Sequence, residues 1–372
     1  MQVRQIDVSS KGDVKKWIEF PFELYKGCAQ WVPPLIEGER NLLDPTKHPF
    51  YQHSQADFFL AEVNGRTLGR IAAMENRRYN EHNRERAAFF GFFEVVEDIQ
   101  AARALFERVV AWALERGLNI VYGPKGLIGA DAAGILVEGF EHRPALTIPY
   151  NYPYYDAFIK DSGFVKERDG LSGYLSGLGE MPERLIQIAE RVKKRRGFWI
   201  KEFNNKDDLR AMAPAVSRVH EQAFGAGYGF YPHTEEEMAW VADELLTIAD
   251  PRLVKLVMRG EDVIGFLFTY HDVSEGLQKA KGQLWPLGWL HLLMARRRTK
   301  WANVNGLGII PEYQGLGANT VLYTELAKTI KAFGFEHIET VLIGEENYRS
   351  FSDNEALGVT WYKRHRLYKR RL

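Results

Sequence analysis

Hydrophobic and polar residues follow the same succession of patterns in two parts of the chain. Residues 61–74 and 256–268 each show an alternating segment, a glycine and a second alternating segment, which is the pattern of a β-hairpin. Residues 104–117 and 321–334 each carry apolar residues at helical spacing, end in glycine and lead into a short apolar segment. The succession of hairpin, helix and strand thus occurs twice, which predicts an α/β protein with two copies of one fold, each with a mixed sheet.

The second copy is longer than the first between hairpin and helix by about 20 residues. We place this insertion at 277–300, around its Trp-Pro-Leu-Gly-Trp core. Glycines and a proline at 176–182 interrupt the pattern between the copies. The predicted domains are therefore 1–178 and 179–372.

The pattern also predicts the order of elements within the second copy. Helices are expected over 182–196, 207–224 and 234–248, a strand over 198–203, and another strand over 301–310.

The length, charge and apolar content of the chain exclude several classes of protein. A chain of 372 residues suits two domains, and 49 basic against 49 acidic residues argue against a nucleic-acid or anionic-membrane binder. The apolar stretch 284–295 is too short to span a bilayer, which takes about 20 residues. The single Cys28 cannot form an internal disulfide, and the first residues lack the apolar core of a signal peptide. We therefore expect a cytoplasmic protein.

The ten histidines show neither an HExxH motif nor paired Cys/His spacing, so no metal site is expected.

A glycine-containing loop joins the strand over 301–310 to the helix that follows. The first turn of a helix has unpaired N–H groups and partial positive charge, and glycines allow a phosphate to approach the backbone closely. A Walker loop is excluded because no Lys-Ser or Lys-Thr follows Gly317. The dinucleotide motif GxGxxG is rejected because Pro311 stands at its third glycine.

The segment 311–319 resembles the coenzyme A pyrophosphate loop of the GNAT superfamily of N-acetyltransferases. Gln314 and Gly317 match the Arg/Gln-x-x-Gly-x-Gly/Ala pattern, whereas Asn319 departs from its final small residue. Downstream, Asn347, Ser350, Leu357 and Gly358 resemble another segment of that superfamily in spacing, but Asn354 stands where its general-acid tyrosine is usual. The resemblance implies tandem acyl-CoA N-acyltransferase (GNAT-like) folds, each a mixed, mostly antiparallel twisted sheet flanked by helices.

The first copy shares the resemblance without the loop. Residues 150–155 and 162–164 resemble the late GNAT segment, but 92–98 enters the helix with three acids and no glycine. Acids suit a helix N-terminus and repel phosphate. We therefore expect 1–178 to be a degenerate domain and 179–372 to bind coenzyme A.

The resemblance implies direct acyl transfer, most simply of acetyl, from acetyl-CoA as co-substrate to a small-molecule or peptide amine, with no metal. The residues implied in binding the cofactor are Gly308, Ile309, Ile310, Gln314, Gly315, Leu316, Gly317, Ala318, Asn319 and Asn347. For Asn347, a simple turn after the strand is an equal alternative.

Candidates for proton transfer are Glu346 and Tyr348, which could equally be solvated residues at a strand end. Tyr155, Trp285 and Trp289 are candidate substrate contacts. Tyr155 could instead belong to the core, and the tryptophans could form a lid, a homodimer face or, less in keeping with the neutral chain, a membrane contact.

Two further functions remain open at this point. The first is a GNAT-fold ligand-binding or assembly protein that has lost its acid and base. The second is aminoacyl transfer from tRNA, which only the basic segment 363–371 supports.

Overall fold

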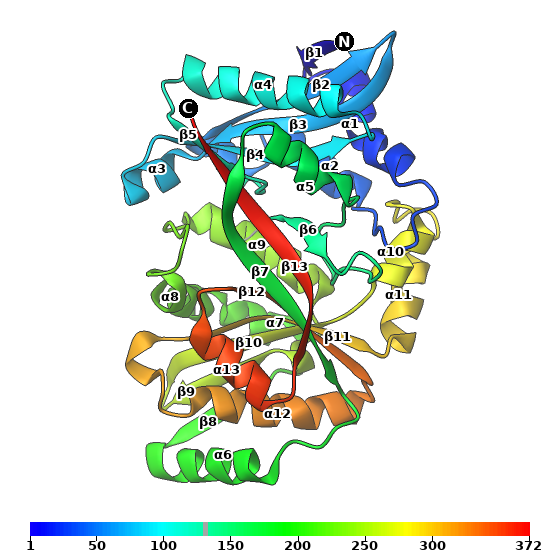
Figure 1. The fold of residues 1–372 in the computed structure, drawn as a ribbon. Helices are drawn as coiled ribbons and strands as arrows, with labels where there is room; N and C mark the ends of the chain where they lie inside the picture. The colour runs from blue at the N-terminus through cyan, green and yellow to red at the C-terminus, as the bar shows by residue number, and fades with distance from the viewer. Residues whose placement is uncertain (129–132) are drawn as a thin grey trace. The chain divides into compact units, whose positions relative to one another are not determined.

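The computed structural model describes residues 1–128 and 133–372 (Figure 1). The chain forms two compact units. Unit 1 consists of residues 1–171, 274–294 and 363–372, and unit 2 consists of residues 172–273 and 295–362. Most of the predicted insertion and the C-terminal strand thus pack with unit 1, although they follow the second hairpin in sequence.

Unit 1 is built on a mostly antiparallel sheet in the order β1-β2-β3-β4-β5-β13, with β6 also paired to β13. Only the β4–β5 pair is parallel among the described pairs of this unit. The strands are β1 (Gln2–Gln5), β2 (Gln55–Val63), β3 (Arg66–Glu75), β4 (Ala87–Val95), β5 (Ile120–Gly123), β6 (Ile135–Glu138) and β13 (Thr360–Arg371).

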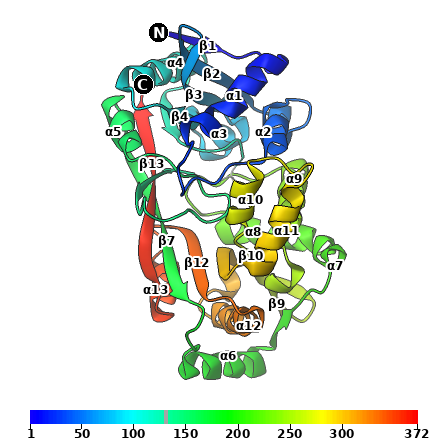
Figure 2. The ribbon, with the colours of Figure 1, turned by 90° about the vertical axis from the view of Figure 1, so that its right-hand side faces the viewer.

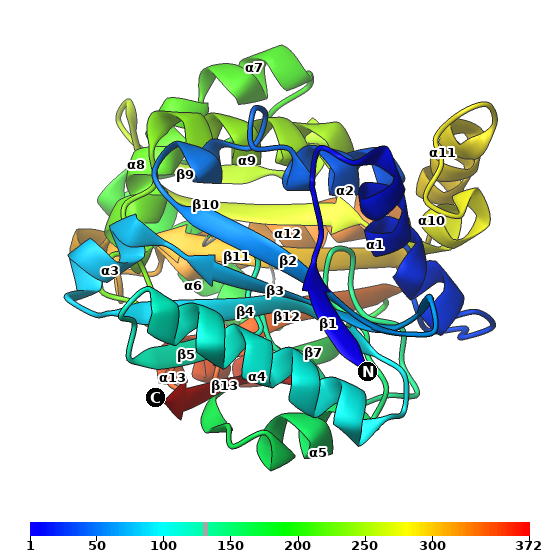
Figure 3. The same ribbon diagram turned by 90° about the horizontal axis from the view of Figure 1, so that it is seen from above.

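Helices cover both faces of this sheet (Figure 3). Phe106 of α4 packs in one core with Phe59 and Ile71, while Trp17 of α1 packs against Phe58, whose side chain points to the opposite face. The helices are α1 (Lys11–Leu24), α2 (Ile36–Leu43), η1 (Pro49–Gln52), α3 (Arg77–Asn83), α4 (Ile99–Glu115), α5 (Tyr154–Asp161), α10 (Ser274–Ala280) and the first part of α11 (Gly288–Arg298).

The sheet of unit 2 has the order β7-β12-β11-β10-β9-β8. β11 and β12 are parallel, whereas β8, β9, β10 and β11 pair antiparallel. The strands are β7 (Val165–Ser176), which begins in unit 1, β8 (Phe198–Lys201), β9 (Lys255–Arg259), β10 (Asp262–His271), β11 (Trp301–Ile309) and β12 (His337–Gly344).

Two groups of helices enclose this second sheet. Leu322 and Leu326 of α12 pack on one face, and Val219 of α8 and Leu246 of α9 belong to the core on the other. The helices are α6 (Glu183–Arg196), α7 (Lys206–Ala211), α8 (Ala213–Phe224), α9 (Glu235–Ile248), η2 (Pro251–Leu253), η3 (Pro311–Tyr313), α12 (Ala318–Phe333) and α13 (Tyr348–Ala356).

One predicted helix of unit 2 is wrong. The expected helix over 207–224 consists of α7 and α8, which meet at Met212. Pro214 lies in the first turn of α8, where a missing N–H is tolerated, and it disfavours helical backbone before it.

Three basic residues of β13 form ion pairs within unit 1. Asp169 accepts hydrogen bonds from Arg364 (3.1 Å) and Arg366 (2.8 Å), and Lys369 forms an ion pair with Glu167 (2.6 Å). These ion pairs show that basic residues of β13 contribute to the packing of the sheet.

Both units combine a mostly antiparallel sheet with flanking helices, which confirms the predicted fold class.

Candidate functional site

A gap opens between β11 and β12 of unit 2. Their parallel register runs from Trp301 opposite His337 to Val304 opposite Thr340. Beyond that point β11 continues along β10 after a register shift, with Gly306 at φ +104°. The separated strand ends leave the edge of β11 facing the gap.

The edge of β11 presents alternate backbone groups to this gap. The Ile310 N–H donates to the Ile264 carbonyl of β10 (3.1 Å), and Gly308 lies opposite Phe266. Because neighbouring residues of a strand direct their N–H groups to opposite sides, the N–H groups of Leu307 and Ile309 point away from β10.

The loop after β11 ends in a helix N-terminus that no described side chain caps. Gly317 is the N-cap of α12 at φ +89°, and Gly315 lies at φ +72°. A Cβ on Gly317 would lie 2.7 Å from Val192 Cγ2, whereas a Cβ on Gly315 would meet no atom within 4 Å. Gly317 is thus required by packing against α6, and Gly315 faces open space.

Side chains on α13 contact this loop. Gln314 donates from Nε2 to the Ile309 carbonyl (3.0 Å) and accepts at Oε1 from Arg349 Nη1 (2.9 Å). Asn319 donates from Nδ2 to Asp353 Oδ2 (2.6 Å). Arg349 and Asp353 are one helical turn apart, so one face of α13 holds the loop and places a guanidinium beside it.

Arg349 was not a candidate at the sequence level. Its position two residues after Asn347, at the start of a helix, is the only signal that could have suggested it.

The other predicted cofactor residues have mostly structural contacts. Ala318 is fully buried in the core, and the Leu316 N–H bonds the Tyr313 carbonyl (3.4 Å). Asn347 caps α13 by accepting at Oδ1 from the Ser350 N–H (3.1 Å).

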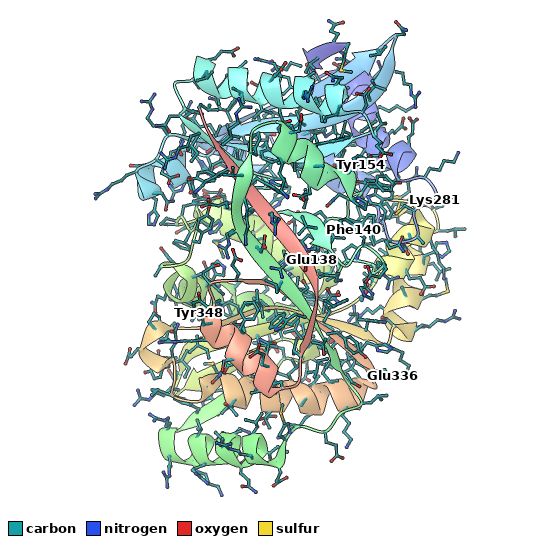
Figure 4. The ribbon with its side chains drawn as sticks, viewed as in Figure 1. Glu138, Phe140, Tyr154, Lys281, Glu336 and Tyr348 are labelled. Carbon is teal, nitrogen blue, oxygen red and sulfur yellow. The ribbon has the colours of Figure 1, made fainter. Side chains whose placement is uncertain are left out.

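The two candidates for proton transfer lie at the surface. Glu346 lies two residues after the end of β12 and is exposed. Tyr348 (labelled in Figure 4) begins α13 and is 78% exposed. Asn354, in contrast, is buried and donates from Nδ2 to the Ser350 carbonyl (2.8 Å).

In unit 1 the corresponding helix, α4, has a capped N-terminus. Asp98 accepts hydrogen bonds from the N–H groups of Gln100 (2.8 Å) and Ala101 (3.2 Å). Its carboxylate occupies the position that a phosphate takes at a helix start.

A carboxyl group that sequence reasoning missed lies near that capped helix. Glu94 stands at the end of β4, after a register shift where Phe92 adopts φ +51°. Its Oε2 accepts hydrogen bonds from the hydroxyls of Tyr25 (2.5 Å) and Tyr155 (2.9 Å). Burial raises the pKa of Glu94 to about 7, against the opposing charge of Arg70.

The register shift gives Glu94 a counterpart in unit 2. Glu94 lies opposite Arg70 just past the shift in β4, and Leu307 lies opposite Leu267 just past the shift in β11. The position that carries an acid in unit 1 is therefore apolar in unit 2.

The three candidate substrate contacts lie in different environments. Tyr155 is fully buried, and its hydroxyl also accepts from the Val95 N–H (2.9 Å), which places it in the core of unit 1. A separate cavity of about 550 Å³ is lined by Glu97, Tyr152, Pro153 and Tyr154. Trp285 and Trp289 are exposed.

Within 1–128 and 133–372, no group of three or more potential ligands is placed to hold a metal ion. The same residues include no helix that is long and apolar enough to cross a membrane.

Comparisons with known proteins cover the whole chain. No protein family model matches it. It is 26% identical over 370 residues to Protein YghO of Escherichia coli (strain K12), covering 98% of this chain and 94% of that protein. It is also 26% identical over 378 residues to the bacterial ceramide synthase of Caulobacter vibrioides (strain NA1000 / CB15N), covering 99% and 97% of the two chains.

Solved structures share the architecture. A tandem GNAT protein from the clavulanic acid biosynthesis pathway aligns with a TM-score of 0.57 at 13% identity, covering 100% of this chain and 98% of that chain. A fungal GCN5-related glucosamine N-acetyltransferase region aligns with a TM-score of 0.54 at 10% identity, covering 99% of this chain and 38% of the other. The chain therefore has the tandem GNAT fold.

Proposed function

We propose that the protein is an acyl-CoA-dependent N-acyltransferase whose cofactor binds to unit 2. The uncapped N-terminus of α12 is the observation that carries this proposal, because its free N–H groups and the neighbouring Arg349 suit a diphosphate. Gly315 leaves room for the anion to approach the backbone.

The acyl thioester would extend from this loop into the gap between β11 and β12. There the N–H groups of Leu307 and Ile309 would donate to the thioester carbonyl as negative charge develops on its oxygen. The amine nitrogen attacks the carbonyl carbon, the C–S bond breaks, and coenzyme A leaves as a thiolate, which takes up one proton from solvent to become the thiol. The amine loses one proton to a base or to water.

The proposed reaction needs a group that accepts this proton. Glu346 and Tyr348 follow β12, are exposed and remain our candidates. If the amine binds in its neutral form, it can instead release this proton directly to solvent after it has attacked the thioester.

A long-chain amine is the acceptor class that we favour. The chain aligns over 99% of its length with a protein named bacterial ceramide synthase. Ceramide is the amide of a long-chain amino alcohol, so its synthesis forms the bond that an N-acyltransferase forms. The alignment with this same protein also favours an acyl group longer than the acetyl group expected from the sequence.

A ligand-binding protein without catalysis is the second candidate. The buried Asn354, which stands at the position expected for the general acid, supports it.

Calorimetric titration with acetyl-CoA and palmitoyl-CoA tests the cofactor site. Gly315→Asp adds a negative charge in open space at a backbone angle that aspartate tolerates, and should weaken binding at least about tenfold. Gly260→Asp is the matched control, because Gly260 has φ +58° and also no atom within 4 Å of a Cβ. Equal affinities of the two variants, or no heat with either ligand, would refute the cofactor site.

Mass spectrometry of product amide then separates the two candidate functions. Incubation with palmitoyl-CoA and dihydrosphingosine, or with acetyl-CoA and the same amine, should yield an amide with the wild-type protein and with Gly260→Asp. Cofactor binding without amide from either donor favours the ligand-binding alternative.

A further inference from the structure

Large apolar side chains are concentrated on the surface of one helical hairpin. α10 and α11 lie side by side (Figure 2), and the segment that joins them continues into the first turns of α11. Five exposed apolar residues occur within 285–293: Trp285 (78% exposed), Leu287 (62%), Trp289 (47%), Leu290 (37%) and Leu293 (38%). We call these five residues the apolar hairpin face. Single exposed apolar residues are ordinary, whereas a contiguous group indicates an interaction surface.

The opposite side of the hairpin is fixed to the rest of unit 1. Gln278 donates from Nε2 to the carbonyls of Ala29 (2.8 Å) and Trp31 (2.9 Å), and the Ile36 N–H donates to the Gly282 carbonyl (2.9 Å). A Cβ on Gly282 would lie 2.6 Å from the Pro34 carbonyl oxygen. The hairpin therefore packs through α10 and Gly282, and this packing leaves the apolar hairpin face uncovered among the described residues.

The polar group of one tryptophan is already satisfied within the hairpin. The indole N–H of Trp289 donates to the Pro286 carbonyl (3.0 Å). Its ring can thus enter an apolar environment without leaving that donor unpaired.

The charge of the hairpin differs from that of the chain. Residues 277–300 contain six Lys and Arg residues and no Asp or Glu, although the whole chain is balanced. Lys279, Arg296 and Lys300 form ion pairs with acids outside this range. Lys281 (labelled in Figure 4), Arg297 and Arg298 are exposed, and none of the ion pairs found among the described residues includes them.

We propose that this hairpin docks the protein peripherally on an anionic lipid surface. The apolar hairpin face enters the interfacial region, and Lys281, Arg297 and Arg298 lie against the lipid headgroups. The α11 helix, with 11 residues, is far too short to span a bilayer and would lie along its surface. In the sequence analysis, the zero net charge of the whole chain argued against a membrane contact. That net charge does not reveal the local excess of Lys and Arg in residues 277–300.

Charge selects the lipid surface over a second copy of the chain. A two-fold contact through the same hairpin would bring the cations of both copies together with no acid in 277–300 to offset them. An anionic lipid surface supplies the missing negative charge. This proposal does not rest on acyl transfer.

Vesicle flotation with the full chain tests the proposal. The wild-type protein should float with vesicles of phosphatidylcholine and phosphatidylglycerol and remain free with phosphatidylcholine alone. Raising the salt concentration should weaken binding, because headgroup attraction is screened. Binding to neither vesicle would overturn the proposal.

Matched double variants distinguish specific docking through this surface from non-specific hydrophobic adsorption to vesicles. Trp285→Ser with Leu287→Ser should reduce binding at least about tenfold. Trp199→Ser with Leu178→Ser removes one exposed tryptophan and one exposed leucine elsewhere, and should bind as the wild type does. Arg297→Glu with Arg298→Glu should also lose binding.

Two outcomes would contradict the docking role of this surface. One is vesicle binding that the hairpin variants leave unchanged while circular dichroism shows them folded. The other is a dimer in sedimentation velocity that Trp285→Ser with Leu287→Ser dissociates, in the absence of vesicle binding, since the surface would then serve self-association.

Discussion

The hydroxyl of Tyr25 lies 2.5 Å from Oε2 of Glu94, an oxygen that also accepts from Tyr155. Burial raises the pKa of Glu94 to about 7 from an ordinary value of 4.5, so the folded chain holds a proton that the unfolded chain releases. The free energy of unfolding should therefore fall as pH rises from 4.5 to 7.

Replacing Glu94 by Gln should remove this pH dependence. The variant keeps an oxygen that accepts from the tyrosines but binds no proton, so its stability relative to wild type should rise by about 1 to 3 kcal/mol between pH 4.5 and 8. Urea unfolding at several pH values measures the difference. His220 and His365, whose pKa values burial lowers to about 4, contribute the opposite slope in both proteins and cancel. Parallel pH profiles of the two proteins would show that Glu94 does not titrate in this range.

Asp169 should contribute strongly to the loss of folding stability at acid pH. Burial raises the pKa of Asp169, but hydrogen bonds from Arg366, Lys166 and Arg364 outweigh it and lower the pKa to about 2. The stability it contributes is present above pH 3.8 and is lost as pH falls towards 2. Asp169→Asn should cost about 3 kcal/mol at pH 7, measured by urea unfolding, because it leaves the Arg366 guanidinium without its counter-charge and removes one of the two acids paired with Arg364.

Asp161→Asn is the control for that measurement. Asp161 pairs with Arg103 in a more exposed setting (2.6 Å), so its loss should cost clearly less stability than the loss of Asp169. Equal costs at both positions would mean that burial of Asp169 adds nothing.

Arg349→Ala should weaken coenzyme A binding. The guanidinium lies beside the loop through its bond to Gln314, and the loss of one charged hydrogen bond to phosphate corresponds to about a tenfold change in affinity. Calorimetry measures this change, with Arg210→Ala, which breaks an exposed ion pair with Asp243, as the control. Unchanged affinity in Arg349→Ala would limit Arg349 to orienting Gln314.

Asp98→Ala should destabilise the protein by about 1 kcal/mol in urea unfolding, because two N–H groups of α4 lose their acceptor. The neighbouring exposed acid offers the comparison, since Glu97→Ala should change stability by less than about 0.5 kcal/mol. Equal effects of the two substitutions would argue against the cap.

Local signals allowed much of the fold to be predicted. The predicted helix over 234–248 corresponds to α9, and the predicted glycine stop at Gly334 ends α12. The break at Met212 was missed because apolar spacing continues across Pro214.

Long-range contacts were beyond this reasoning. Nothing within 277–300 reveals that Gln278 bonds the backbone near Trp31, and no spacing rule brings Arg349 to Gln314. Glu94 was noted only as one of three acids, because the tyrosines that surround it come from distant positions. For the site, the loop glycines were visible in sequence, whereas the side chains that hold the loop were not.

The path of β13 constrains how the protein matures during synthesis. Residues 363–372 belong to the unit that contains the N-terminus, and Tyr368 to Arg371 pair with β5. Residues 363–372 must therefore be synthesised before the sheet formed by the much earlier residues 1–171 acquires this strand. Until then β5 exposes an unpaired edge to the crowded interior of the cell, and a nascent chain halted just before residue 363 would present that edge to chaperones and proteases.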